Sequence, residues 1–134
     1  MTSPEMENLA ADPAIEVLIK QLAFALATVP GQWWVMESVA MPIAAPALVI
    51  GPPRMTVRGY TFAGGGVTTV QMNIYIVVAM NQYTIDNLRQ VVTSVMYALE
   101  RYTPGVVLGS VPGVYPSPSG ALPAMIVTYQ SELH

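Results

Sequence analysis

The chain has 134 residues, a formal net charge of −3, no cysteine and a single histidine, His134. Disulfides, thiolate zinc sites and cysteine nucleophiles are therefore excluded, and one C-terminal histidine cannot build a catalytic triad or a metal cage within a subunit. Nucleic-acid binding by charge neutralisation is disfavoured because the five basic residues are scattered along the chain: Lys20, Arg54, Arg58, Arg89 and Arg101.

Charged residues make up 10% of the sequence, against roughly 25% in ordinary soluble domains, and the mean hydropathy is +0.48. The apolar stretches are too short or too broken to span a membrane, since residues 38–53 hold four prolines and residues 67–86 hold Gln and Asn. The N-terminus is acidic, unlike a signal peptide. Contact with other protein is then the remaining way to keep this apolar surface from water, so we expect an extensive subunit interface and no membrane partner.

The length fits one domain over residues 1–134, with residues 1–11 as a loose arm. Asp12 and Pro13 predict a helix start that runs to about Thr28 and stops before Pro30. Apolar residues occupy nearly the whole circumference of this helix, which indicates cover on more than one side. Two arrangements satisfy this: full burial inside the subunit, or one face on the core and one on a neighbouring subunit.

Strands are predicted next. Bulky and β-favouring residues over 33–39 indicate the first, and residues 47–50 form a short apolar strand that ends at Gly51. Residues 54–62 alternate, with Arg54, Thr56, Arg58 and Tyr60 on the polar side. Gly64, Gly65 and Gly66 then supply the flexible tip of a hairpin.

The return strand from Val67 has the clearest alternation in the chain. Its apolar face should lie on the core, and its other face should be wet or polar. The apolar residues are Val70, Met72, Ile74, Ile76, Val78 and Met80, and the polar face carries Thr69, Gln71, Asn73 and Tyr75.

A one-faced amphipathic helix follows, from Thr84 as N-cap to about Tyr102. Two last strands are expected, about 106–111 and 123–131, with residues 112–120 as the connection between them. This order of elements predicts an α+β fold, a mixed and mostly antiparallel β-sheet with two α-helices packed on one face.

Candidate chemical motifs favour structural interpretations. The triple glycine precedes a strand, whereas a phosphate loop needs a helix N-terminus or a Lys-Ser/Thr directly after it. The carboxylates of Glu37, Asp86, Glu100 and Glu132 are expected on separate elements, so no glycosidase-like pair is indicated. The sequence therefore predicts no enzyme, no catalytic residues, no metal site and no cofactor. Trp33 and Trp34 should point to opposite faces of their strand, one toward the core and one toward an interface or solvent.

Three phrases of the sequence resemble the tail terminator (tail completion) proteins of siphophages, particularly those of actinobacterial hosts. They are PIAAPALVIGPP, VTTVQMNIYIVVAMNQYTIDNLRQVVTSVMYALE and LPAMIVTYQSEL, and the resemblance spans roughly residues 12–132. It implies a structural virion protein of the tail neck, assembled in the host cytoplasm as a homohexameric ring. Such a ring caps the tail tube protein, stops its polymerisation and offers its other face to the head-tail connector protein.

The resemblance transfers no catalytic residue. We expect interface contacts from Arg54, Arg58, Tyr60, Gly64, Gly65, Gly66, Trp33 and Trp34. The alternatives are another head-tail connector or neck subunit, and a small ligand-binding α+β domain.

Overall fold

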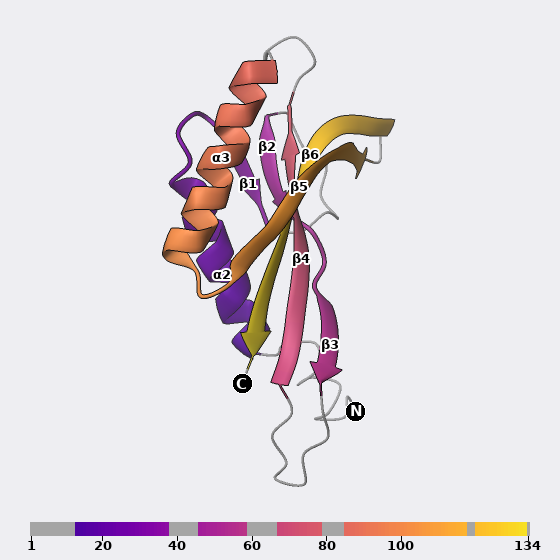
Figure 1. The fold of residues 1–134 in the computed structure, drawn as a ribbon. Coiled ribbons are helices and arrows are strands. Elements are labelled where there is room, and N and C mark those ends of the chain that lie inside the picture. Colours follow the sequence, from indigo (N-terminus) through magenta and orange to yellow (C-terminus); the bar gives the residue numbers. More distant parts are fainter. Residues whose placement is uncertain (1–12, 38–45, 59–66, 79–84, 118–119, 134) are drawn as a thin grey trace, which may run out of the picture.

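A computed structural model describes residues 13–37, 46–58, 67–78, 85–117 and 120–133. These residues form two helices and a six-stranded mixed sheet, mostly antiparallel, with the helices packed on one face (Figure 1). The predicted α+β architecture is therefore confirmed. No helix in the described part of the chain is long and apolar enough to cross a membrane.

Helix α2 (Pro13–Ala27) begins and ends close to the predicted bounds, and Glu16 in its first turn favours the positive end of the helix dipole. One side of α2 is buried, with Leu22 and Leu26 fully covered. The opposite side exposes 56% of Val17 and 64% of Phe24. Full burial inside the subunit, one of the two arrangements left open by the sequence, is thus excluded.

Helix α3 (Ile85–Tyr102) buries one stripe of the predicted apolar residues, including Val92, Val95 and Leu99. It ends where the backbone N–H of Thr103 donates to the carbonyl of Leu99 at 3.2 Å, and the Thr103 hydroxyl donates to the same oxygen. The buried hydroxyl thereby satisfies a carbonyl of the last turn, as helix ends require.

The sheet has the strand order β1-β2-β4-β6-β5, and β3 pairs with β4 beyond the end of β2. Only the β1–β2 pair is parallel among the described pairs. The strands are β1 (Trp34–Met36), β2 (Ala47–Ile50), β3 (Arg54–Arg58), β4 (Val67–Val77), β5 (Val106–Ser117) and β6 (Gly120–Leu133).

The Gly51-Pro52-Pro53 segment joins β2 to β3 along the same side of β4. Ile50 pairs with Ile74 and Arg54 with Gln71, so the β2–β3 side carries one residue more than β4 over this interval. A glycine is needed here, because a Cβ on Gly51 would lie 2.9 Å from the carbonyl oxygen of Asn73. The close approach lets Gly51 N–H donate to that oxygen at 2.7 Å.

The prediction of a connection over residues 112–120 is wrong, because β5 continues to Ser117 and β6 starts at Gly120. Prolines normally argue against a strand, but β5 is the last strand on its side of the described sheet. Pro112 and Pro116 are an even number of residues apart, so both can direct their missing N–H away from β6. The edge position thus tolerates two prolines that a central strand would not.

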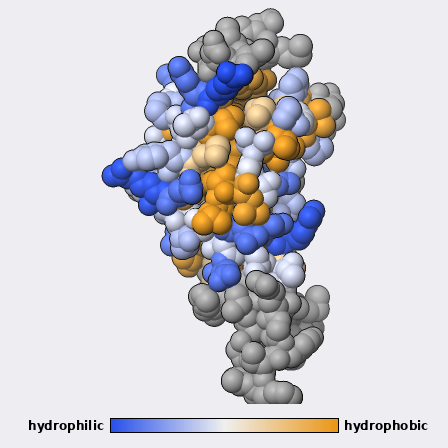
Figure 2. Space-filling view, viewed as in Figure 1, coloured by the Kyte–Doolittle hydropathy of each residue, from blue (hydrophilic) through white to orange (hydrophobic). Residues whose placement is uncertain are grey.

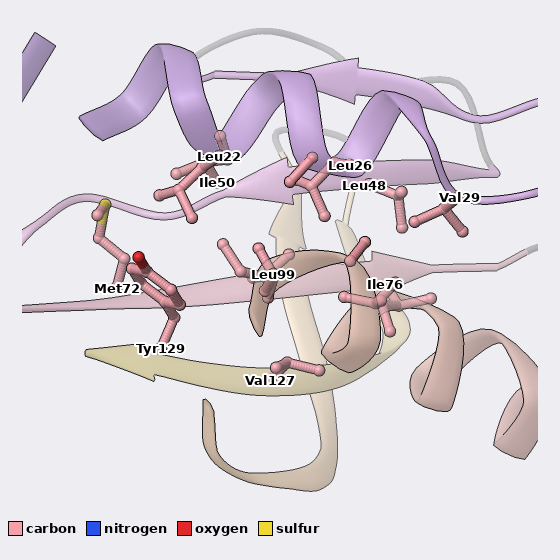
Figure 3. Close-up of a cluster of buried hydrophobic side chains, with 14 of the residues drawn as sticks. Leu22, Leu26, Val29, Leu48, Ile50, Met72, Ile76, Leu99, Val127 and Tyr129 are labelled. Atoms are coloured by element: carbon pink, nitrogen blue, oxygen red, sulfur yellow. The ribbon is translucent and has the colours of Figure 1, made fainter. Parts of the chain in front are cut away.

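The main core lies between the helices and the sheet (Figure 3). As predicted, one face of β4 supplies Val70, Met72, Ile74 and Ile76, all at most 1% exposed. Figure 3 shows side chains from α2, α3, β2, β4 and β6 meeting in this layer. It labels Leu22, Leu26, Val29, Leu48, Ile50, Met72, Ile76, Leu99, Val127 and Tyr129.

A second apolar cluster lies on the face of the sheet that carries no helix. It contains Ala47, Val49, Val77, Tyr115 and Ala124, all buried. In Figure 1 the free end of the β5–β6 hairpin bends away from the helices, and Tyr115 from this end packs its ring edge-on to Tyr75 at 5.4 Å. The expectation that this whole face is wet or polar is therefore wrong near Tyr75 and Val77, because the hairpin covers them.

Candidate interaction surfaces

The predicted interface residues fall into described and undescribed groups. Arg54 is exposed on β3 and lines a shallow groove with Pro52, Pro53, Gln71, Asn73 and Tyr75. Arg58 ends β3 with its backbone paired to Val67. Tyr60 and the triple glycine, Gly64 to Gly66, lie outside the described residues, as does the side chain of Arg58.

The two tryptophans separate as the sequence predicted. Trp33 is half-buried against the main core, and its indole N–H donates to the carbonyl of Pro30 at 3.0 Å. Trp34 leaves 64% of its surface exposed on β1. Trp34 therefore remains available for an interface, whereas Trp33 serves the core.

A polar strip runs over the helix-free face beside Arg54. The amide of Gln71 donates to the side-chain oxygen of Gln130 at 3.0 Å, and the Thr128 hydroxyl donates to the side-chain oxygen of Asn73 at 3.4 Å. These bonds cross from β4 to β6 and hold the side chains in fixed positions. The strip offers amide and hydroxyl groups, with Arg54 adding a positive charge at its margin.

An aromatic helix surface forms the outer side of the helix layer. We define it by Val17, Phe24, Tyr97 and Tyr102, whose exposed fractions range from 41% to 64%. The rings of Phe24 and Tyr102 meet edge-on at 5.8 Å. Hollows of about 420 Å³ and 390 Å³ flank this ring pair, the first lined partly by Val17 and the second partly by Tyr97.

Arg101 lies over two rings of this surface. Its guanidinium donates to the Tyr97 hydroxyl at 2.7 Å and lies 5.8 Å and 5.5 Å from the ring centroids of Tyr97 and Tyr102. The hydrogen bond that Arg101 donates to Tyr97, and secondarily the nearby Tyr102, raise the pKa of Arg101 above its usual value. Arg101 thus stays charged and helps to fix both tyrosines at the surface.

The second exposed apolar surface is the β5 edge, which has exposed aliphatic side chains on both faces of the strand: Val111 lies on the helix-free face with Tyr115, and Val114 lies on the opposite face. The exposed residues that define it are Val106, Leu108, Val111 and Val114. Each leaves at least half of its surface in water. Figure 2 shows apolar surface on the face that β5 crosses in Figure 1. This surface is not among the predicted interface residues, although the sequence carries a signal for it: no Asp, Glu, Lys or Arg occurs from Tyr102 to Ser131. Edge strands commonly carry charges that prevent association.

Charged groups are sparse on the described elements and do not assemble into a chemical site. Lys20 of α2 pairs with Glu37, which follows β1, at 2.9 Å, and both side chains are largely exposed. Among the residues that the structure describes, no group of three His, Cys, Asp or Glu could hold a metal ion.

No protein-family model and no curated protein matches this chain.

Proposed function

We propose that this protein is a tail terminator, a structural virion protein that forms a ring on the tail tube and stops tube growth. The observation that carries the proposal is a subunit with two unlike apolar surfaces, the aromatic helix surface and the β5 edge. Two different surfaces suit a head-to-tail contact, and head-to-tail contacts close into rings when the rotation allows. The resemblance in sequence supplies the expectation of a hexamer in the tail neck.

Stopping a polymer requires a ring with two unlike ends. One end matches the last ring of tube subunits, and the other cannot accept another tube ring, so growth ends because the complementary surface is lost. Repetition around the ring lets individually modest contacts add through effective concentration. The proposal therefore requires binding surfaces and no chemical step, with the tail tube protein and the head-tail connector as partners.

Arg54 and the polar strip beside it are our candidates for contact with the tube. The polar strip presents fixed amide and hydroxyl groups on the helix-free face, and Arg54 lies on the strand that leads to the hairpin tip. Polar and charged groups at the rim of an interface set register and partner choice more than affinity. Such contacts fit a ring that must recognise one partner at one end.

The test is to block production of this protein during infection and to image the particles. We expect filled heads without tails beside tubes of uncontrolled length. Tails of correct length that fail to join heads would instead support the neck-connector alternative. A purified protein that stays monomeric at all concentrations, with and without tube protein, would contradict the ring and favour a small ligand-binding domain.

A further inference from the structure

The aromatic helix surface carries a stripe of side chains at the spacing of packed helices. Four exposed positions of α2 follow one another in steps of three, four and three residues. They hold Ala14, Val17, Gln21 and Phe24. Residues at this spacing form one continuous stripe along a helix, the pattern through which helices pack on each other. The inner side of α2 already packs on the core through Leu22 and Leu26, so the stripe is a second packing face.

This surface is complementary in shape to a second copy of itself. The Phe24–Tyr102 ring pair is a ridge, and the hollow of about 420 Å³ beside it is lined mainly by α2 residues between positions 16 and 21. Phe24 and Val17 lie three and four residues to either side of Gln21. When two α2 helices cross antiparallel with a two-fold axis near Gln21, Phe24 of each copy therefore lies over Val17 of the other. Each ridge then enters the hollow of the second copy.

The charges of this surface also match a second copy. Arg101 lies beside the ridge, held by Tyr97 and Tyr102, and Glu16 lines the hollow. Within the described residues, neither Arg101 nor Glu16 forms an ion pair. Entry of the ridge into the hollow brings Arg101 of one copy toward Glu16 of the other, and the two-fold axis makes the same pair a second time. Complementary charges of this kind fix the register of an interface.

The β5 edge is a poorer occupant of the hollow. Its aliphatic side chains lie on both faces of the strand, with Val111 and Val114 on opposite faces, so they offer no single row. The chain from Tyr102 to Ser131 contains no Asp, Glu, Lys or Arg, so β5 has no charge to pair with Glu16 or Arg101. A second aromatic helix surface supplies both the ridge and the charges.

The exposed area matches a weak, reversible dimer. With about 200 Å² per aromatic side chain, the exposed parts of Phe24, Tyr97 and Tyr102 total roughly 330 Å² in each copy. Two copies bring together about 660 Å² of apolar surface, and because homodimer interfaces are about 65% apolar, the whole contact is about 1,000 Å². This area is at the lower limit for a specific interface, so we expect the dimer to exchange with the monomer.

We propose that two copies of the free subunit pair through the aromatic helix surface in a two-fold dimer, with α2 packed antiparallel on the second α2. The ring of the proposed function needs a contact between unlike surfaces. The dimer covers one of these surfaces, so the dimer and the ring exclude each other, and contacts with the tail tube shift the balance toward the ring. This exclusion rests on the proposed function, whereas the dimer itself does not.

A cysteine near the two-fold axis tests the dimer directly, because the chain has no cysteine of its own. In Gln21→Cys, the new thiol meets the same thiol of a second copy when the contact is two-fold, and not when the contact is head to tail. We expect oxidised glutathione to give a disulfide-linked dimer of twice the 14.4 kDa chain mass on a non-reducing gel. Gln90→Cys, an exposed glutamine about two turns of α3 from Tyr97, is the matched control and should crosslink little.

Charge reversal tests the pairing of Arg101 with Glu16. Arg101→Glu or Glu16→Arg alone places like charges opposite each other twice in each dimer. We expect either variant to raise the dissociation constant of the dimer about tenfold, measured by sedimentation, with thermal melting as the check on folding. The variant with both changes exchanges the two charges and should regain the wild-type dissociation constant. Single variants that dimerise like the wild type, or a double variant that regains nothing, would overturn this arrangement of the two copies.

The remaining outcomes separate the inference from the function. A free wild type that stays monomeric, or a Gln21→Cys variant that crosslinks no more than Gln90→Cys, overturns the dimer and leaves the tail terminator proposal standing. The crosslinked Gln21→Cys dimer should form rings on the tube only after reduction, and rings formed equally well before reduction would overturn the exclusion. A wild type that forms no ring even with tube protein contradicts the proposed function itself.

Discussion

The two faces of the sheet are covered in different ways. On the helix side, every inward residue of β4 from Val70 to Ile76 is buried beneath α2 and α3. On the other face, β4 is polar at Gln71 and Asn73 and then buried at Val77, beneath the end of the β5–β6 hairpin. Local alternation thus identifies the face that helices cover. The face that the β5–β6 hairpin covers shows a weaker alternation in the sequence of β4, because only the residues near Val77 are buried there.

The largest expected effect tests the helix-covered face. Val92 is 8% exposed and packs in the main core, so Val92→Asp would bury an unpaired charge. This costs several kcal/mol against a total stability of about 5–15 kcal/mol, and we expect the variant not to fold. The measurement is circular dichroism and solubility, with Gln90→Asp on the exposed side of α3 as a control that should fold. A soluble Val92→Asp variant with an unchanged melting temperature would contradict the placement of α3.

The second prediction tests the hairpin-covered face. Tyr115 is fully buried between β2, β4 and β6, and Tyr115→Ala would leave a cavity beside Val49 and Val77. We expect a loss of about 3–5 kcal/mol in the free energy of unfolding, as for other large aromatic side chains in cores. Denaturant titration measures this. A loss below about 1 kcal/mol would show that the second apolar cluster is loosely packed and contributes little to the free energy of unfolding.

The third prediction concerns the turn that leads from α3 into β5. The N–H of Gly105 donates to the Tyr129 hydroxyl at 2.9 Å, and a Cβ on Gly105 would collide with the carbonyl oxygen of Gln130 and with the Tyr129 ring. We expect Gly105→Ala to cost about 1–3 kcal/mol, because β5 and Tyr129 would have to move apart. Gly109→Ala is the control, since nothing lies within 4 Å of its added Cβ. Equal melting temperatures for the two variants would argue against this packing.

Much of the fold could be predicted from short-range patterns. The alternation from Val67 and the stripe of α3 each specify one buried face, and both predictions are confirmed. The extension of β5 through Pro112 and Pro116 could not be predicted, because a proline is acceptable in a strand only where that strand lies at an edge. Edge position is a property of the assembled sheet.

The candidate surfaces were partly predictable. Exposure of Phe24 on α2 follows from an apolar circumference that one core cannot cover, and the sequence left that arrangement open. The β5 edge could not be predicted, although Val106, Leu108 and Val111 lie inside the predicted strand, because the position of β5 at the edge of the sheet is set by the strand order and not by a local pattern. The interface roles expected for Arg54, Arg58 and Trp34 stay predictions.

The fourth prediction uses pH to examine the hairpin-covered face. Burial, and secondarily the neighbouring Tyr75, raise the pKa of Tyr115 above its ordinary value near 10. The unfolded chain therefore releases this proton at lower pH than the folded chain, so the stability from this group is complete below pH ~10 and falls as the pH rises further. Tyr115→Phe keeps the ring and removes the proton. We expect the wild type to lose more stability than Tyr115→Phe between pH 9 and 11, measured as the difference in denaturation midpoint.

The smallest effect on stability, and the most direct probe of the tube-facing hypothesis, is expected from Arg54→Ala combined with Arg58→Ala. Arg54 is exposed beside Gln71 and Asn73, and exposed charges contribute about 0–1 kcal/mol, so the melting temperature should barely change. If the arginines contact a neighbouring subunit or the tube, ring formation or tail capping should weaken, and more steeply at high salt because rim charges are screened. Arg89→Ala, an exposed arginine on α3, is the matched control and should assemble normally. Wild-type rings and wild-type tail capping by the double variant would reduce Arg54 and Arg58 to solvated strand charges, and the search for the tube contact would then move along the polar strip to Gln71 and Gln130.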